Sequence, residues 1–140
     1  MKTLTPDKSI AFKDIGILLL RMFLGLAMLF GHGIGKWTML FESNDIKFAD
    51  PFGIGVIPSL AMTVFAEVIC ALLLTIGLLT RLSVIPLIIT MLVAAFSVHL
   101  LDGFSGMEKA LLYGIGFLSI LITGPGKYSI DALLKRKVNY

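Results

Sequence analysis

Long apolar stretches alternate with short polar segments along the whole chain. Four stretches are long enough to cross a bilayer, and they cover about residues 14–33, 58–79, 82–101 and 108–123. A transmembrane helix needs about 20 predominantly apolar residues, so a chain of 140 residues has room for four spans and little else. The pattern therefore predicts an all-α protein, an integral membrane four-helix bundle.

The composition agrees with this pattern. Hydrophobic residues make up 57% of the chain, against about 45–50% in a soluble domain. A soluble core of this size could not enclose so much apolar surface, so we expect the lipid bilayer to bury the excess. The single cysteine, Cys70, excludes an internal disulfide. There is no phosphate loop, catalytic triad or nucleic-acid signature, and we name no catalytic residue and no nucleic-acid partner.

The chain divides into three parts by composition. Residues 1–13 form a polar N-terminal segment, residues 14–134 the membrane domain, and residues 135–140 a basic tail. The N-terminal segment has three lysines and no continuous apolar core, so we expect the first span to remain as an uncleaved anchor. Eight of the twelve lysine and arginine residues fall on the side of both termini and three on the other. The positive-inside rule then places both termini in the cytoplasm.

The connection between the first two spans, residues 37–57, mixes aromatic and acidic residues. Trp37 is suited to a membrane interface, and Asp50-Pro51 is a turn signal. Two interpretations are open at this point. The segment is either a surface loop with aromatic anchors or a cover that dips inward over a cavity.

Arg21 is a charge inside the first span. Such a charge costs about 2.5–3.5 kcal/mol on insertion scales, so it persists where it has a partner, reaches the interface by snorkelling or has a function. A rise of about 1.5 Å per residue places Arg21 about 10 Å and Glu67 about 18–20 Å from the same face of the membrane. Two long side chains can close that gap. We therefore predict an intramembrane ion pair, Arg21–Glu67, which either has a structural role alone or lines a polar cavity.

A second polar group is expected near the outer ends of the spans. His32 and His99 fall at that level, Lys36 follows His32 by one helical turn, and Glu108 begins the fourth span. With Glu67 these residues form a candidate ligand cavity. A quinone headgroup site, a haem or metal held by the two histidines, and plain interfacial pairing are all consistent with this set. Because two histidines without a local motif are weak support for a metal, we assign no metal site and no covalently bound cofactor.

The sequence resembles the DoxX family of small four-helix membrane proteins of bacteria over about residues 14–134. The matching features are Arg21, Gly31-His32-Gly33 with Lys36, Phe48-Ala49-Asp50-Pro51 with Gly53-Ile54-Gly55, Phe65-Ala66-Glu67, Gly77-Leu78-Leu79-Thr80-Arg81, the region of His99, Glu108 with Ala110-Leu111-Leu112-Tyr113, and Gly124-Pro125-Gly126-Lys127-Tyr128-Ser129-Ile130-Asp131.

This resemblance implies a location in the bacterial inner membrane and a link to quinone or thiol redox chemistry. The expected function is that of a membrane subunit of an oxidoreductase system that binds quinone in its polar cavity, with a protein partner or a second copy of the chain in the membrane. Two alternatives stay open, a non-catalytic scaffold or accessory subunit of a larger envelope complex and a small-solute transport component. Whether the protein is itself an enzyme is left open too.

Overall fold

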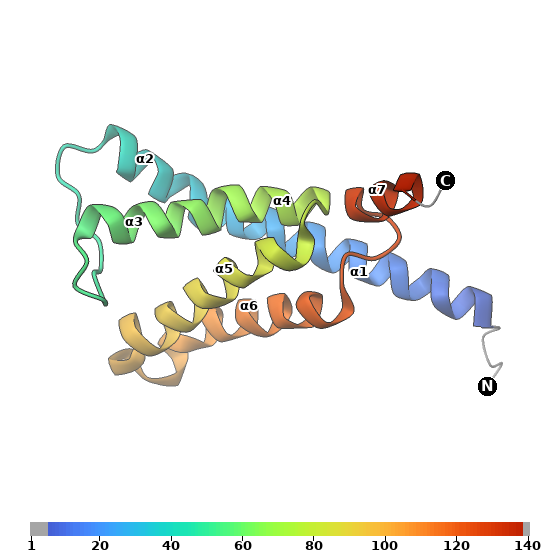
Figure 1. Cartoon of the computed structure of the whole chain (residues 1–140). Coiled ribbons are helices and arrows are strands. Elements are labelled where there is room, and N and C mark those ends of the chain that lie inside the picture. The colour runs from blue at the N-terminus through green and yellow to red at the C-terminus, as the bar shows by residue number, and fades with distance from the viewer. Residues whose placement is uncertain (1–5, 139–140) are drawn as a thin grey trace.

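The computed structural model of the chain describes residues 6–138, and every regular element within them is a helix (Figure 1). Four helices are long and apolar enough to cross a membrane, which confirms the predicted fold class. Residues 1–5 of the predicted N-terminal segment and residues 139–140 of the predicted tail lie outside the described residues.

Two of the four long helices change their winding midway. The first consists of α1 (Pro6–Met28), a π-helical segment (Leu29–Gly33) and α2 (Ile34–Glu42). The second consists of α3 (Val56–Val64), a π-helical segment (Phe65–Cys70) and α4 (Ala71–Ile76). A π-helical segment holds one residue more per turn than its flanks, so it changes which side chains share a face.

The second half of the chain contributes the other two long helices and one short one. The third long helix is α5 (Thr80–Val93) with a π-helical segment at its end (Ala94–Val98), and a 3₁₀ turn (Leu100–Asp102) leads into α6 (Gly103–Thr123). The short helix α7 (Ile130–Val138) follows the last span. Pro86 lies inside α5, and the helix continues through it.

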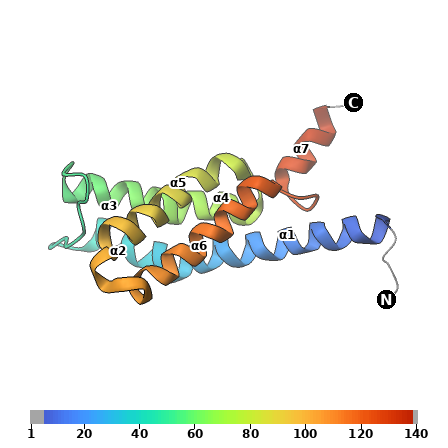
Figure 2. The same ribbon diagram turned by 90° about the horizontal axis from the view of Figure 1, so that it is seen from below.

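The long helices form a bundle with antiparallel neighbours. α1 packs against α4 and α6, α5 packs against α4 and α6, and α2 packs against α3 (Figures 1 and 2). The core is apolar, and its buried members are Leu24, Met28, Cys70, Ala71, Leu74, Val84, Leu87, Met91, Ala95, Ala110, Phe117 and Ile120. We call the end where α4 and α6 finish the closed end. The end that holds the α2–α3 connection and the turn into α6 is the open end.

Two helices extend beyond the predicted spans. The first helix continues to Glu42 instead of ending near residue 33, and α6 begins at Gly103 instead of near residue 108. Hydropathy placed these ends where polar residues first appear. A polar side chain such as Lys36 can remain in the helix because it finds its partner inside the bundle.

Arg21 is completely buried at the closed end, with 1% of its surface exposed. Its Nη1 donates to the carbonyl oxygen of Pro125 at 2.9 Å, and its Nη2 donates to that of Tyr128 at 2.7 Å. The predicted ion pair Arg21–Glu67 is therefore wrong in its partners. A guanidinium has five donors, and the turn after α6 brings backbone oxygens within their reach. Glu67 lies nearer the open end and accepts a hydrogen bond from Lys36.

Gly77 lets the end of α4 lie directly against Arg21. It ends the helix with φ of 75°. The N–H of Leu78 donates to the carbonyl oxygen of Leu73 and that of Gly77 to the carbonyl oxygen of Leu74, as in a Schellman cap. A Cβ atom at this position would overlap the Arg21 guanidinium and lie 2.7 Å from the Cβ of Ser129. The site therefore requires glycine for two reasons, its backbone angle and the space.

Asp131, in the first turn of α7, caps the beginning of α5. Its Oδ1 accepts from the N–H of Leu79 at 2.8 Å and its Oδ2 from that of Thr80 at 2.9 Å, while its own N–H donates to the carbonyl oxygen of Gly77. Partial burial raises the pKa of Asp131, but the hydrogen bonds from Thr80 and Leu79 and the charge of Lys135 outweigh it and bring the pKa below its ordinary value. The last helix is thereby fastened to the turn between α4 and α5.

We expect Gly77→Ala to lower the free energy of unfolding by about 3 kcal/mol. Alanine is strained at this left-handed backbone angle, and its Cβ would also overlap the buried guanidinium of Arg21. Unfolding of the purified protein by sodium dodecyl sulfate in mixed micelles measures this. The matched control is Gly16→Ala on α1, where a Cβ meets nothing within 4 Å. The control should change stability by less than about 1 kcal/mol, in the stabilising direction. Equal losses in the two variants would contradict the assigned role of Gly77.

We expect Asp131→Asn to lower the free energy of unfolding by about 1 kcal/mol at neutral pH, because one of the two N–H groups loses its acceptor. The lowered pKa means that the wild-type carboxylate stabilises the fold above the ordinary pKa of aspartate, and that this contribution disappears as pH falls through the lowered value. The difference between the two proteins should therefore shrink from neutral pH to about pH 3. The exposed Asp45→Asn serves as the control, and a difference that does not depend on pH would contradict the cap.

Candidate ligand-binding cavity

A cavity of about 940 Å³ occupies the open end of the bundle, between α2 and α3 on one side and α5 and α6 on the other. Ligand pockets of proteins measure about 300–1,000 Å³, so this cavity is at the large end of that range. Its wall is mainly apolar. The polar side chains on it are those of His32, Lys36, Ser59, Thr63, Glu67, Thr90, His99, Ser105, Lys109 and Tyr113.

The three π-helical segments all reach this cavity. His32 belongs to the first, Glu67 to the second, and Ala94 and Val98 to the third, and each of these residues lines the wall. π-helical turns occur frequently at functional sites because the extra residue redirects a side chain. Their gathering on one cavity marks this level of the bundle as the candidate functional site.

The pair Lys36–Glu67 lies at the centre of the polar side chains. Lys36 Nζ is 2.5 Å from Glu67 Oε2, and only 3% of the Glu67 side chain and 23% of the Lys36 side chain are exposed. Glu67 lies about 16 Å along its helix from the start of α3, near the middle of the span. A carboxylate at that depth needs a cation, since an unpaired buried charge is strongly destabilising.

Gly33 brings the two partners together. It is buried, and a Cβ atom there would lie 2.5 Å from the carbonyl oxygen of Glu67. The first two helices therefore touch at their backbones at this level. Lys36, one turn further along, then reaches across the contact to the Glu67 carboxylate.

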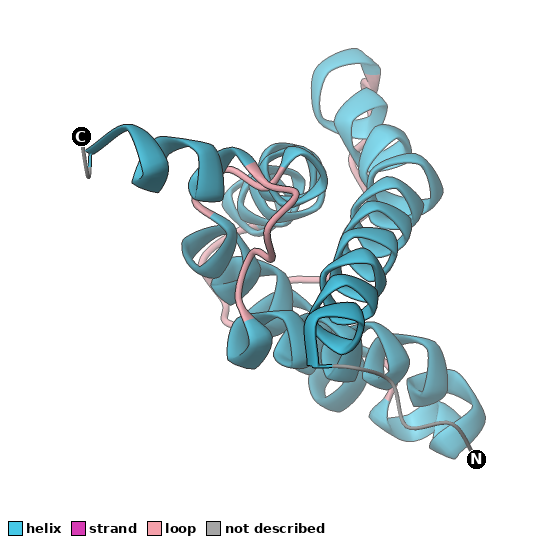
Figure 3. Cartoon of the chain, turned by 90° about the vertical axis from the view of Figure 1, so that its right-hand side faces the viewer, coloured by secondary structure: helices cyan, strands magenta, loops and turns pink. Residues whose placement is uncertain are grey.

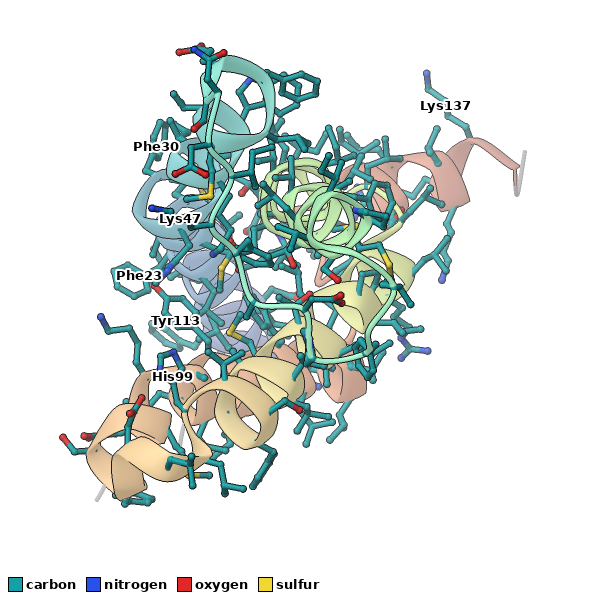
Figure 4. All side chains as sticks on the ribbon, turned by 90° about the vertical axis from the view of Figure 1, so that its left-hand side faces the viewer. Phe23, Phe30, Lys47, His99, Tyr113 and Lys137 are labelled. Atoms are coloured by element: carbon teal, nitrogen blue, oxygen red, sulfur yellow. The ribbon has the colours of Figure 1, made fainter. Side chains whose placement is uncertain are left out.

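The two histidines have different partners. The His32 ring meets the Tyr113 ring edge-on with 5.7 Å between centroids, and Tyr113 in turn stacks on Phe117 at 6.0 Å. His99 Nδ1 lies 2.8 Å from Asp102 Oδ2 in the next turn. Both histidines line the cavity, and Figure 4 shows His99 with Tyr113 on the α6 side. Within residues 6–138, no three His, Cys, Asp or Glu side chains are grouped so that they could hold a metal ion.

Glu108 does not belong to the cavity, contrary to the prediction. It is exposed on α6, while Lys109 and Tyr113 line the wall. Successive helix residues are about 100° apart, so a helix that presents Gly106, Lys109 and Tyr113 to the cavity turns Glu108 away. The spacing of three and four residues between these positions was the signal in the sequence for Lys109 and Tyr113, and the prediction missed both.

The connection between α2 and α3 covers the cavity. Phe48, Ala49, Pro51, Phe52 and Ile54 line it, and Figure 4 shows this segment crossing the open end of the bundle. Of the two interpretations of the sequence, the geometry supports the cover.

Asp50 fixes this cover to the beginning of α3. Its carboxylate accepts hydrogen bonds from the Ser59 hydroxyl at 2.8 Å and from the N–H groups of Gly55 and Ile54. The bond from Ser59, with those from the backbone, holds the pKa of Asp50 below its ordinary value. The Asp50 carboxylate therefore fixes the conformation of this connection and joins it to α3.

Comparison with known proteins gives the family of the chain. The family model described as DoxX matches residues 16–100. An uncharacterized protein of Haemophilus influenzae is 32% identical over 129 residues, which cover 87% of this chain and 85% of that protein. An uncharacterized membrane protein of Mycobacterium tuberculosis is 30% identical over 141 aligned residues, with 86% and 82% covered. No solved structure matches the chain. On the match of the family model and the two relatives, the chain belongs to the DoxX family of membrane proteins.

Proposed function

We propose that this protein is a membrane subunit of an oxidoreductase system and that it binds a quinone in the cavity at the open end. The observation that carries the proposal is the form of this cavity. It has a large apolar wall, lies within the membrane-spanning helices, and holds the buried pair Lys36–Glu67. An amphipathic lipid-soluble molecule with a small polar head has the matching form.

The polar side chains of the wall suit the head of a quinone, which is a flat ring with two carbonyl oxygens. Lys36, Lys109 and the Tyr113 hydroxyl are hydrogen-bond donors, and carbonyl oxygens are acceptors. The apolar side chains of α3 and α5 and of the cover supply a surface for the ring and its hydrocarbon tail. The wall has one carboxylate, that of Glu67, and more donors than this. The excess of donors favours a ligand with hydrogen-bond acceptors.

A bound quinone would supply two-electron, two-proton redox chemistry to the site. The residues of this chain bind and orient the head, and they exclude water from it through the cover. His32 and the carboxylate of Glu67 are groups on the wall at which a proton can be held. Electrons would come from and go to a protein partner in the membrane.

The position of the core favours binding over transport. Buried apolar side chains of all four long helices fill the bundle between the cavity and the closed end, among them Met28, Leu74, Leu87 and Phe117. A solute that entered the cavity would meet this packed layer. A pure scaffold, in turn, does not require a cavity of this size.

We also propose the orientation of the protein in the membrane. The closed end carries the first turns of α1, the helix α7 and most of the lysine and arginine residues of the described chain, so by the positive-inside rule it faces the cytoplasm (Figure 1). The cavity and its cover then lie toward the outer face of the inner membrane.

Quinone binding is tested by titrating the full-length protein in lipid nanodiscs with a short-tailed benzoquinone and a short-tailed naphthoquinone. Quenching of Trp37, the one tryptophan, reports binding. We expect the double variant Lys36→Gln/Glu67→Gln to bind at least about tenfold more weakly, because a charge-assisted contact to the head is lost. This variant removes both charges together and so leaves no buried charge unpaired.

The control for this titration is Glu42→Gln, an exposed residue at the end of α2. It should bind like the wild type. Equal binding by wild type and double variant, or quenching that rises without saturation in all three proteins, would contradict the proposal.

A further inference from the structure

A second, smaller hollow lies at the closed end, beside α7. Figure 3 shows α7 leaving the bundle sideways. It measures about 330 Å³ and lies between the end of α4 and the first turns of α7. Its wall includes Ile76, Tyr128 and Leu133, and Lys127 and Arg136 contribute to the same wall. The hollow thus combines apolar side chains with two cations.

The apolar part of this wall faces outward. Ile76, Tyr128 and Leu133 are 41%, 47% and 57% exposed. Large apolar side chains that stay exposed next to the membrane-spanning helices are positioned for contact with acyl chains. They lie at the level where α4 ends at Ile76 and α6 at Thr123, which is the depth of the membrane interface in a four-span bundle.

The second feature of this wall is the charge of its two cations, Lys127 and Arg136. Among the ion pairs formed by the side chains of residues 12–137, none involves Lys127 or Arg136. Two carboxylates near by bond backbone groups: Asp131 accepts from the N–H groups of Leu79 and Thr80, and Asp14 accepts from the backbone N–H of Lys127. Positive charge is therefore available to an outside partner at the height of the lipid headgroups.

From this arrangement we infer that the hollow binds one anionic phospholipid of the surrounding leaflet. Its phosphate lies against Lys127 and Arg136, and an acyl chain runs along Ile76, Tyr128 and Leu133. Basic residues at the interface attract anionic lipids. The apolar wall beside them can contact an acyl chain, which a lipid has and a free anion lacks. The inference is independent of the proposed quinone site, which lies at the other end of the bundle.

A lipid in this position also contacts the closed end of the bundle. Tyr128 lines the hollow, and its carbonyl oxygen accepts a hydrogen bond from Arg21. Ser129, the next residue, lies beside Gly77. A bound lipid therefore holds the segment that closes the bundle, and it should raise the thermal stability of the protein.

The test is native mass spectrometry of the full-length protein in detergent with added phosphatidylglycerol or phosphatidylcholine of the same acyl chains. The wild type should retain one phosphatidylglycerol in preference to phosphatidylcholine, and phosphatidylglycerol should raise the midpoint of thermal unfolding. In the variant Lys127→Gln/Arg136→Gln we expect affinity for phosphatidylglycerol to fall about 10- to 30-fold, the effect of two basic residues near a lipid surface.

The matched control is Lys135→Gln/Lys137→Gln, which removes the same net charge from α7, at positions outside the hollow. It should keep most of the affinity. Equal losses in the two double variants would show diffuse attraction to α7 and overturn the site, as would equal retention of the two lipids by the wild type. Glycerol phosphate, which has the headgroup without acyl chains, should not stabilise the protein, and equal stabilisation by it would also overturn the inference.

Discussion

A guanidinium group inside a membrane protein has to find its acceptors in the protein, because the hydrocarbon offers none. Arg21 finds them in the carbonyl oxygens of Pro125 and Tyr128, more than a hundred residues away. This contact ties the first span to the turn after the last one. Gly77 lies against the same guanidinium, and Asp131 joins α7 to the adjoining turn between α4 and α5. With the bundle closed at this end, the helices can separate at the other end and leave a cavity.

The need of buried polar groups for partners within the protein also determines the polar side chains of the cavity. Glu67 is buried at mid-depth and persists there because Lys36 neutralises it at 2.5 Å. The backbone contact at Gly33 and the π-helical segments on both sides set the direction of these side chains. Polar groups that are costly in a membrane are thus gathered on one wall, where a ligand with acceptor groups can use them.

Hydropathy was sufficient for the fold, since four apolar stretches of spanning length allow few other arrangements of a chain of this size. The polar residues were harder to place. His32, Lys36, Glu67 and His99 do line one cavity, as their levels in the spans indicated. The partner of Arg21 was missed because backbone oxygens leave no mark in a pattern of side chains. The ion pair of Glu67 with Lys36 was missed because the first span was ended near residue 33, which placed Lys36 at the outer ends of the spans and Arg21 nearer to Glu67 in depth. Glu108 was included for its level in the membrane, without regard to its direction on the helix.

The length of the first helix has a mechanical consequence. The stretch Phe12–Glu42 rises about 46 Å at about 1.5 Å per residue, whereas the hydrocarbon core is about 30 Å thick. The second span, Val56–Ile76, rises about 31 Å by the same measure and matches the bilayer. The excess of roughly 15 Å is more than an ordinary tilt of about 20° absorbs. The first helix therefore extends beyond the hydrocarbon core, and the helical backbone outside the core is surrounded by lipid headgroups or water.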